Sequence, residues 1–149
     1  MWLDLARTGQ NLVWRHPWPP DIITSLVSLA NPQGTITNSD LELAALVLQE
    51  TTLLKAVPKA CMVAPRSGSD NTLTVSWSMC EASMINPVVA DLLRIRALHS
   101  RKLFLNPSVF YHMGQENCMA DDASCLFYLS DTEFLTHISV VHPQLHGLC

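Results

Sequence analysis

The sequence predicts a mixed domain of the α/β or α+β class, in which helices flank a sheet. The first observation is the order of its apolar segments, which alternate along the chain between strand-like and helix-like patterns. The second is a length of 149 residues, enough for one sizeable core. The third is a composition of 48% hydrophobic and 15% charged residues, which hints at a covered surface or a missing piece. We expect one domain over residues 1–129 and a C-terminal extension or linker over 130–149.

The N-terminal region is expected to form a β-hairpin. Its arms are MWLDL (1–5) and NLVWR (11–15), which flank a turn that contains glycine. Three prolines in HPWPPD (16–21) end the second arm, because proline removes a donor from the ladder. The apolar stretch over 22–34 then closes in turn residues.

The stretch NSDLELAALVLQ (38–49) predicts a helix that is apolar nearly all round, and such a helix is buried on more than one side. Ser39 and Glu42 fit the S-x-x-E pattern of a capping box, in which the two side chains satisfy backbone donors at the helix start. Asp40 falls in the first turn, where the helix dipole favours an acid.

The middle of the chain predicts a strand, a loop and a second long helix. ACMVAP (60–65) has the composition of a buried strand, and RSGSDNT (66–72) that of a loop. The helix is marked by Asn86 as its cap and Pro87 at its first position, ahead of an apolar-periodic run.

The last third of the chain predicts a strand and a short helix before the extension. KLFLNPSVFYHM (102–113) is strand-like, and CMADDASCLFYL (118–129) is helix-like. The residues from Ser130 onward mix polar and apolar side chains, so we expect a docked or fraying extension there.

Charge, cysteine content and hydropathy limit the binding partners and the compartment expected for this chain. A net charge of −4 gives no basic footprint of a self-sufficient nucleic-acid binder, so such contacts would need local patches or a neighbouring domain. Five irregularly spaced cysteines without a signal peptide favour reduced thiols in an intracellular compartment. No run of 18 apolar residues exists, so neither a transmembrane helix nor a membrane partner is expected.

Three acids stand in particular local settings. Glu42 lies in the predicted helix start, Asp70 follows the serine-rich stretch SGS, and Asp121 opens the short helix after GQEN. Each has a structural interpretation, since Asp70 suits an Asx turn and Asp121 suits a helix N-terminus. Together they place three carboxylates on three elements.

The motifs around these acids resemble a known family. TNSDLELAA (37–45), SGSDNTLTVSW (67–77) and GQENCMADDAS (114–124) occur in the order found in the ribonuclease H domain that follows the reverse transcriptase in retrotransposon polyproteins. The N-terminal stretch is similar to that family's second and third strands, and the tail is similar to elements with a tyrosine recombinase downstream. The third motif resembles PGKENVVADALSR of the family at Gly114, Glu116, Asn117, Ala120, Asp121 and Ser124.

The resemblance implies a ribonuclease H-like mixed sheet flanked by helices, and a catalytic set of four acids. Glu42, Asp70 and Asp121 match three of the four, whereas Asp40 and Asp122 match none. Two Mg²⁺ ions held by such acids hydrolyse the RNA strand of an RNA–DNA hybrid, and a reverse transcriptase domain precedes the domain in the parent polyprotein.

Departures from the family concern the first acid and its strand. The family's first aspartate lies before the point that matches Trp2, so we expect the first strand to be missing and this chain to have little or no nuclease activity alone. Met113 and Cys125 replace a proline and an arginine common in the family. Whether the chain is an enzyme therefore stays open. The alternatives are a non-catalytic interaction module with the same fold and a non-functional element remnant.

Competing sites are weakly marked. His112, Cys118 and Cys125 lack the paired C-x-x-C spacing of zinc motifs. Cys61 lies in an apolar stretch, where a thiol behaves as a small hydrophobe. His112 is interpreted as a strand-end residue with a structural hydrogen bond, in preference to a group that assists proton transfer.

Overall fold

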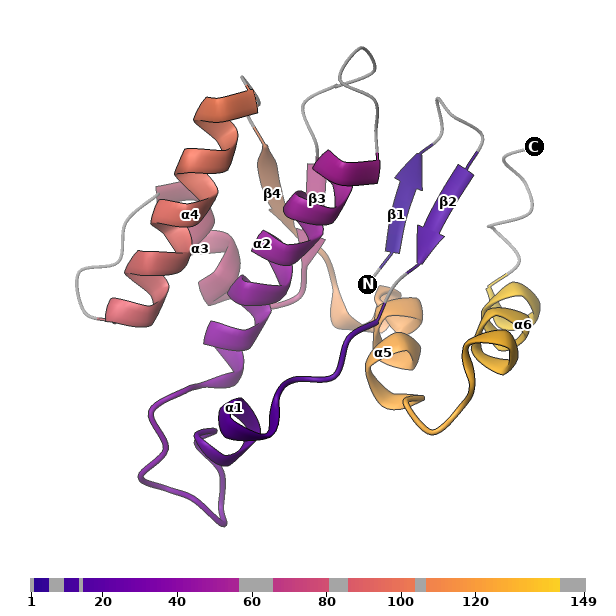
Figure 1. Cartoon of the computed structure of the whole chain (residues 1–149), viewed down its shortest axis with the longest axis horizontal. Coiled ribbons are helices and arrows are strands. Elements are labelled where there is room, and N and C mark those ends of the chain that lie inside the picture. The colour runs from indigo at the N-terminus through magenta and orange to yellow at the C-terminus, as the bar shows by residue number, and fades with distance from the viewer. Residues whose placement is uncertain are drawn as a thin grey trace. The chain divides into compact units, whose positions relative to one another are not determined.

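The computed structural model describes residues 2–5, 10–13, 15–56, 66–80, 86–103 and 107–142 (Figure 1). These residues form six α-helices, one short 3-10 helix and four strands, so the chain is mixed α/β as predicted. The chain divides into two compact units. The terminal unit comprises residues 1–17 and 114–149, and the central unit comprises residues 18–113.

The hairpin prediction is confirmed in the terminal unit. Strand β1 (Trp2–Leu5) pairs antiparallel with β2 (Gln10–Val13). The register sets Trp2 opposite Val13 and Leu5 opposite Gln10.

The central unit contains a parallel pair of strands, and one of them lies in the predicted loop. Strand β3 (Arg66–Ser69) pairs with β4 (Ser108–Tyr111). The loop prediction for 66–72 is wrong because the buried side of β3 carries Ser67 and Ser69, two small polar residues that give no hydrophobic alternation. The predicted strand over 60–65 lies outside the described residues.

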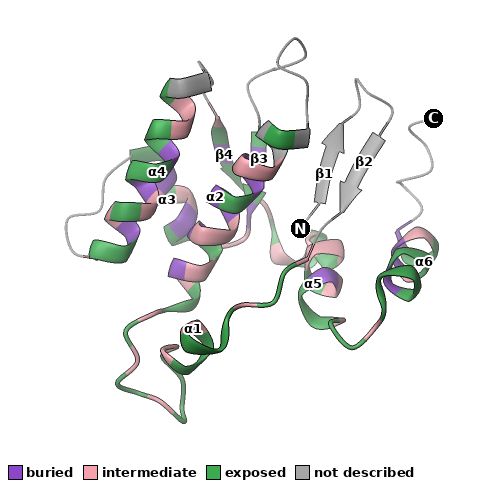
Figure 2. Cartoon of the chain, in the orientation of Figure 1, coloured by how far each residue is buried: buried purple, intermediate pink, exposed green. Residues whose placement is uncertain are grey.

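Helices cover the buried side of this pair. Helix α2 (Asn38–Ala56) packs against α3 (Thr72–Cys80) and α4 (Pro87–Leu103), so the nearly all-round apolar helix is buried on more than one side (Figure 2). A short helix, α1 (Pro20–Thr24), precedes them in the chain. Because α4 extends to Leu103, the strand predicted from Lys102 is confirmed only over β4. The core of the unit comprises Leu43, Leu46, Val89, Leu93 and Val109.

The terminal unit continues after β4 with three short helices. These are η2 (Gly114–Glu116), α5 (Cys118–Cys125) and α6 (Asp131–Val141). The helix predicted over 118–129 ends at Cys125, and the extension beyond Ser130 folds as α6. This helix is docked, because its Phe134 and Ile138 form a core with Ala123 of α5.

The strands seen in the described ranges form two separate pairs, β1 with β2 and β3 with β4. The structure thus shows the mixed α/β class, while a ribonuclease H-like sheet remains a prediction. Among the helices of the described ranges, none has the length and apolar character needed to cross a membrane.

Candidate active site

The start of α2 is closed by a capping box, but not by the predicted residues. The backbone N–H of Thr37 donates to Asp40 Oδ2 at 2.8 Å, and the Asp40 N–H donates to Thr37 Oγ1 at 3.3 Å. The capping-box prediction for Ser39 and Glu42 is therefore wrong by two residues. Both registers fit the same S/T-x-x-acid pattern, and Ser39 is already inside the helix.

Asp40 also joins α2 to α4. Its side chain is buried, with 1% exposure, and its Oδ1 accepts a hydrogen bond from Asn86 Nδ2 at 2.8 Å. The Oδ1 of Asn86 in turn accepts from the Val88 N–H at 2.9 Å, which confirms Asn86 as the cap of α4. One carboxylate thus connects the starts of two helices.

A second set of bonds joins the start of α2 to the end of β3. Asp70 directly follows β3, and its neighbour Asn71 caps α3 by accepting from the backbone N–H of Thr74 at 3.1 Å. The Asn71 Nδ2 donates to Ser39 Oγ at 3.0 Å, and the Thr74 hydroxyl donates to the Ser39 carbonyl at 3.3 Å. The side chain that caps α3 here is that of Asn71, although the sequence suggested Asp70 for a turn of this kind.

These bonds place two of the three predicted acids on joined segments. Glu42 lies three residues beyond Ser39 and is exposed, and Asp70 is half-buried beside Asn71. Asp121 lies in the first turn of α5 and is exposed, within the terminal unit. Glu42, near the start of α2, and Asp70, between β3 and α3, therefore lie on segments that hydrogen bonds join. Asp121 belongs to the terminal unit.

The donor chemistry of these acids fits a hard cation. Carboxylate oxygens are the ligands that Mg²⁺ prefers, and Glu42 and Asp70 both reach solvent. Over the ranges that the structure describes, no group of three or more His, Cys, Asp or Glu side chains is placed to hold a metal ion. A magnesium site at Glu42, Asp70 and Asp121 thus stays a prediction.

The residues considered for zinc lie in different units. The His112 backbone N–H donates to the Ser69 carbonyl at 2.9 Å, so this histidine continues the β3–β4 pairing. Cys118 and Cys125 are free and exposed on α5. The Cys118 thiol donates to the Gln115 carbonyl at 3.1 Å.

A buried ion pair in the central unit gave no signal in the sequence. Arg96 Nε donates to Glu50 Oε1 at 2.9 Å, and both side chains are about one-twentieth exposed. The guanidinium also donates to the carbonyls of Ser78 and Pro107, at 3.0 and 3.2 Å. Burial raises the pKa of Glu50, although the neighbouring Arg96 opposes that rise. The pair joins α2 and α4 to α3, through Ser78, and to Pro107, the residue before β4.

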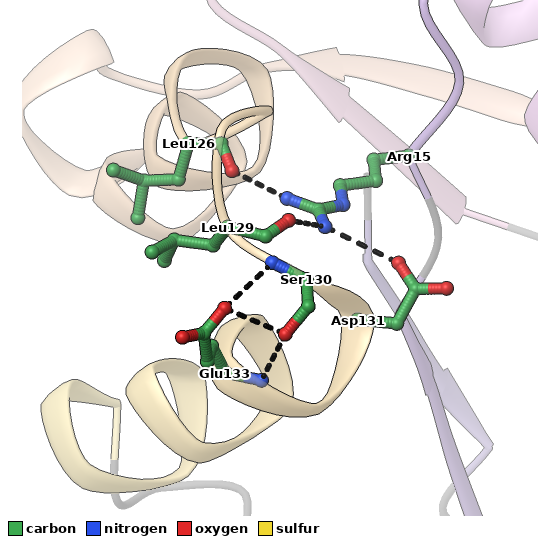
Figure 3. Close-up of polar contacts among 6 residues, drawn as sticks. All are labelled: Arg15, Leu126, Leu129, Ser130, Asp131 and Glu133. Atoms are coloured by element: carbon green, nitrogen blue, oxygen red, sulfur yellow. Dashed lines mark hydrogen bonds and ion pairs between the residues drawn. The ribbon is translucent and has the colours of Figure 1, made fainter.

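Arg15 makes a comparable cluster in the terminal unit (Figure 3). Its guanidinium donates to the carbonyls of Leu126 and Leu129, the latter at 2.6 Å, and pairs with Asp131 at 3.2 Å. It also lies 4.3 Å from the centre of the Phe134 ring. The connection between α5 and α6 is thus held by a residue more than a hundred positions earlier in the sequence.

Asp122, the residue after the predicted acid Asp121, accepts two hydrogen bonds from α6 and its end. Its Oδ2 lies 2.9 Å from His142 Nε2 and 3.2 Å from His137 Nε2. The His142 bond, followed by that from His137, lowers the pKa of Asp122 against an opposing effect of burial. We call these three residues the Asp122 clasp.

Comparison with known proteins adds no relative to this description. No family model, no curated protein and no solved structure matches the chain.

Proposed function

We propose that the chain is the ribonuclease H part of a retroelement reverse transcriptase, in which Glu42, Asp70 and Asp121 are the metal-binding acids. The family activity is hydrolysis of the RNA strand of an RNA–DNA hybrid with Mg²⁺. Because the sequence matches three of the family's four acids, we expect weak or no cleavage by this chain alone. The expected partner is the reverse transcriptase domain of the parent polyprotein, in an intracellular compartment.

The observation that supports the proposal is that the helix caps beside Glu42 and Asp70 are made by other residues. The sequence suggested that Glu42 caps the start of α2, but Asp40 makes that cap. The sequence likewise suggested a turn role for Asp70, but Asn71 caps α3 at that turn. Neither cap is therefore made by Glu42 or Asp70, and the proposal assigns metal binding to these two carboxylates.

The bonds around Ser39 support a shared role for the two acids. Asn71 and Thr74 both bond to Ser39, which ties the start of α3 to the first turn of α2. A carboxylate on each of these segments can contribute oxygen ligands from two elements that are fixed to one another.

The chemistry of the acids is that of ligands. When bound, the ions would activate water and stabilise the leaving oxygen of a phosphodiester. Glu42 and Asp70 would hold the cation through hard oxygen donors. The hybrid would be recognised through groove shape and 2′-hydroxyls more than through base sequence.

The proposal is tested by Mn²⁺ titration of the ¹⁵N-labelled full chain, followed by paramagnetic broadening of amide signals. We expect selective broadening around Glu42, Asp70 and Asp121. Glu42→Gln and Asp70→Asn should each abolish the response at the central unit. Asp91→Asn is the matched control, because Asp91 is an exposed acid of the same unit.

Two results would count against the proposal. The first is broadening around Asp91 as strong as that around Glu42. The second is broadening in the central unit that persists in both Glu42→Gln and Asp70→Asn. Either result would favour the non-catalytic interaction module or the inactive remnant. A parallel assay with an RNA–DNA hybrid and Mg²⁺ tests the expected low activity. Robust cleavage that Glu42→Gln abolishes would overturn that expectation while supporting the metal-binding role.

A further inference from the structure

The Asp122 clasp bonds α5 to α6 and to the residue that follows it. A carboxylate oxygen only accepts, so both His142 Nε2 and His137 Nε2 carry the hydrogen that each bond needs. His142 lies just past the end of α6 with a 9% exposed side chain, and His137 lies inside that helix. Two donors from one element thus hold a single oxygen of another.

Helix α6 is itself held at both ends. At its start, Ser130 and Glu133 form a capping box, and Arg15 binds the preceding carbonyl of Leu129. At its end, His142 belongs to the clasp. Between these points Phe134 and Ile138 pack in the core with α5. The start of α6 is therefore held by contacts that do not involve the clasp.

The direction of Asp121 follows from that of Asp122. Successive residues of an α-helix lie about 100° apart around its axis, since 3.6 residues make a turn. With Asp122 bonded to α6, Asp121 is turned away from that contact, and it is exposed. A rotation of α5 that released Asp122 would move Asp121 by the same angle.

We propose that Asp122, gripped by His142 and His137, is a positioning residue that sets the direction of the Asp121 carboxylate. On this view residues 130–142, which lie in the segment 130–149 expected from the sequence to be an extension or linker, contribute to metal binding through Asp121. The effect of the clasp on metal binding by Asp121 rests on the proposed function. Its effect on the stability of α5 is independent of that function.

The test compares three variants of the full chain by Mn²⁺ broadening and amide hydrogen exchange. His142→Ala removes the shorter bond of the clasp, and His142→Gln keeps an N–H donor. His16→Ala is the control, because His16 is an exposed histidine of the same unit.

We expect His142→Ala to weaken Mn²⁺ binding at Asp121 by about 10–100-fold, the usual cost of losing a partner that orients a ligand. It should also speed amide exchange in α5, and His142→Gln should restore both properties. The amide spectrum of the metal-free variant around Glu42 and Asp70 should stay unchanged, since a general loss of fold would change it.

Unchanged Mn²⁺ broadening at Asp121 in His142→Ala would overturn the positioning role. If the unmodified chain shows no Mn²⁺ response anywhere, the proposed function fails, and amide exchange in α5 then decides the clasp. Faster exchange in His142→Ala with recovery in His142→Gln supports the clasp, and equal exchange in all variants overturns it.

Discussion

Helices α2 and α6 begin with the same motif used in two different ways. In α2 the acid of the capping box, Asp40, is buried and also bonds Asn86 of a second helix. In α6 the corresponding acid, Glu133, is exposed and bonds Ser130 within its own turn. A capping box is thus a local device in one unit and a link between helices in the other.

Ion pairs show the same contrast within the central unit. The Glu50–Arg96 pair is buried and bonds two further carbonyls, whereas Arg94 and Asp91 of α4 pair at 2.8 Å on the surface. Interactions that look alike as pairs differ in how much structure depends on them, because water replaces a lost partner only at the surface.

The largest expected effect is on the buried pair. Glu50→Gln or Arg96→Met should lower the free energy of unfolding by about 3–5 kcal/mol, because each leaves a buried charge or its partners uncompensated. Arg94→Met is the control and should change it by less than about 1 kcal/mol. Urea unfolding of the three variants measures both. Similar losses in all three would remove the contrast between buried and exposed pairs.

Loss of Arg96 should also change the pH dependence of stability. Burial raises the pKa of Glu50, and Arg96 is the main opposing cause, so Arg96→Met should raise that pKa further. A carboxyl whose folded pKa exceeds its unfolded value binds more protons when folded, so stability falls as pH rises through that interval. As pH rises from the ordinary pKa of glutamate, the free energy of unfolding should fall more in this variant than in the unmodified chain. Urea unfolding at a series of pH values measures the difference.

The next effect concerns the two capping acids. Asp40→Ala should cost roughly 2 kcal/mol or more, since it removes both the cap of α2 and the buried hydrogen bond from Asn86. Glu133→Ala should cost less, because water can bond the groups it leaves. Thermal unfolding ranks the two. Equal losses would show that the Asp40–Asn86 bond adds nothing to the local cap.

The smallest effect is expected at Ser130. Ser130→Ala should cost about 1 kcal/mol, the usual value for an N-cap residue. Its side-chain and backbone bonds lower the pKa of Glu133, so the variant should return that pKa toward the ordinary glutamate value. Carboxyl ¹³C NMR titration measures the change. A pKa that stays low in the variant would mean that the hydroxyl is not the main cause.

Local patterns predicted the hairpin and the start of α4 at Asn86 and Pro87, because turn residues and caps act over a few positions. They missed β3, whose buried residues are Ser67 and Ser69, and they gave the wrong register for the cap of α2, because two overlapping motifs fit. The contacts of Arg15 and Asp122 were beyond such reasoning, since their partners are set by tertiary packing. The acids Glu42, Asp70 and Asp121 could be proposed from motifs, but not their setting.

The Asn86 amide has a consequence for how this sequence can change. One end of the amide accepts from α4 and the other donates to Asp40, so aspartate at position 86 would set two carboxylates face to face. Asparagine at position 40 would relieve this, because its own amide could donate to the new carboxylate while its oxygen still accepted from Thr37. Relatives of this chain should therefore carry Asp and Asn at positions 40 and 86, or the exchanged pair, but seldom two aspartates. The two helix starts would evolve as one coupled pair.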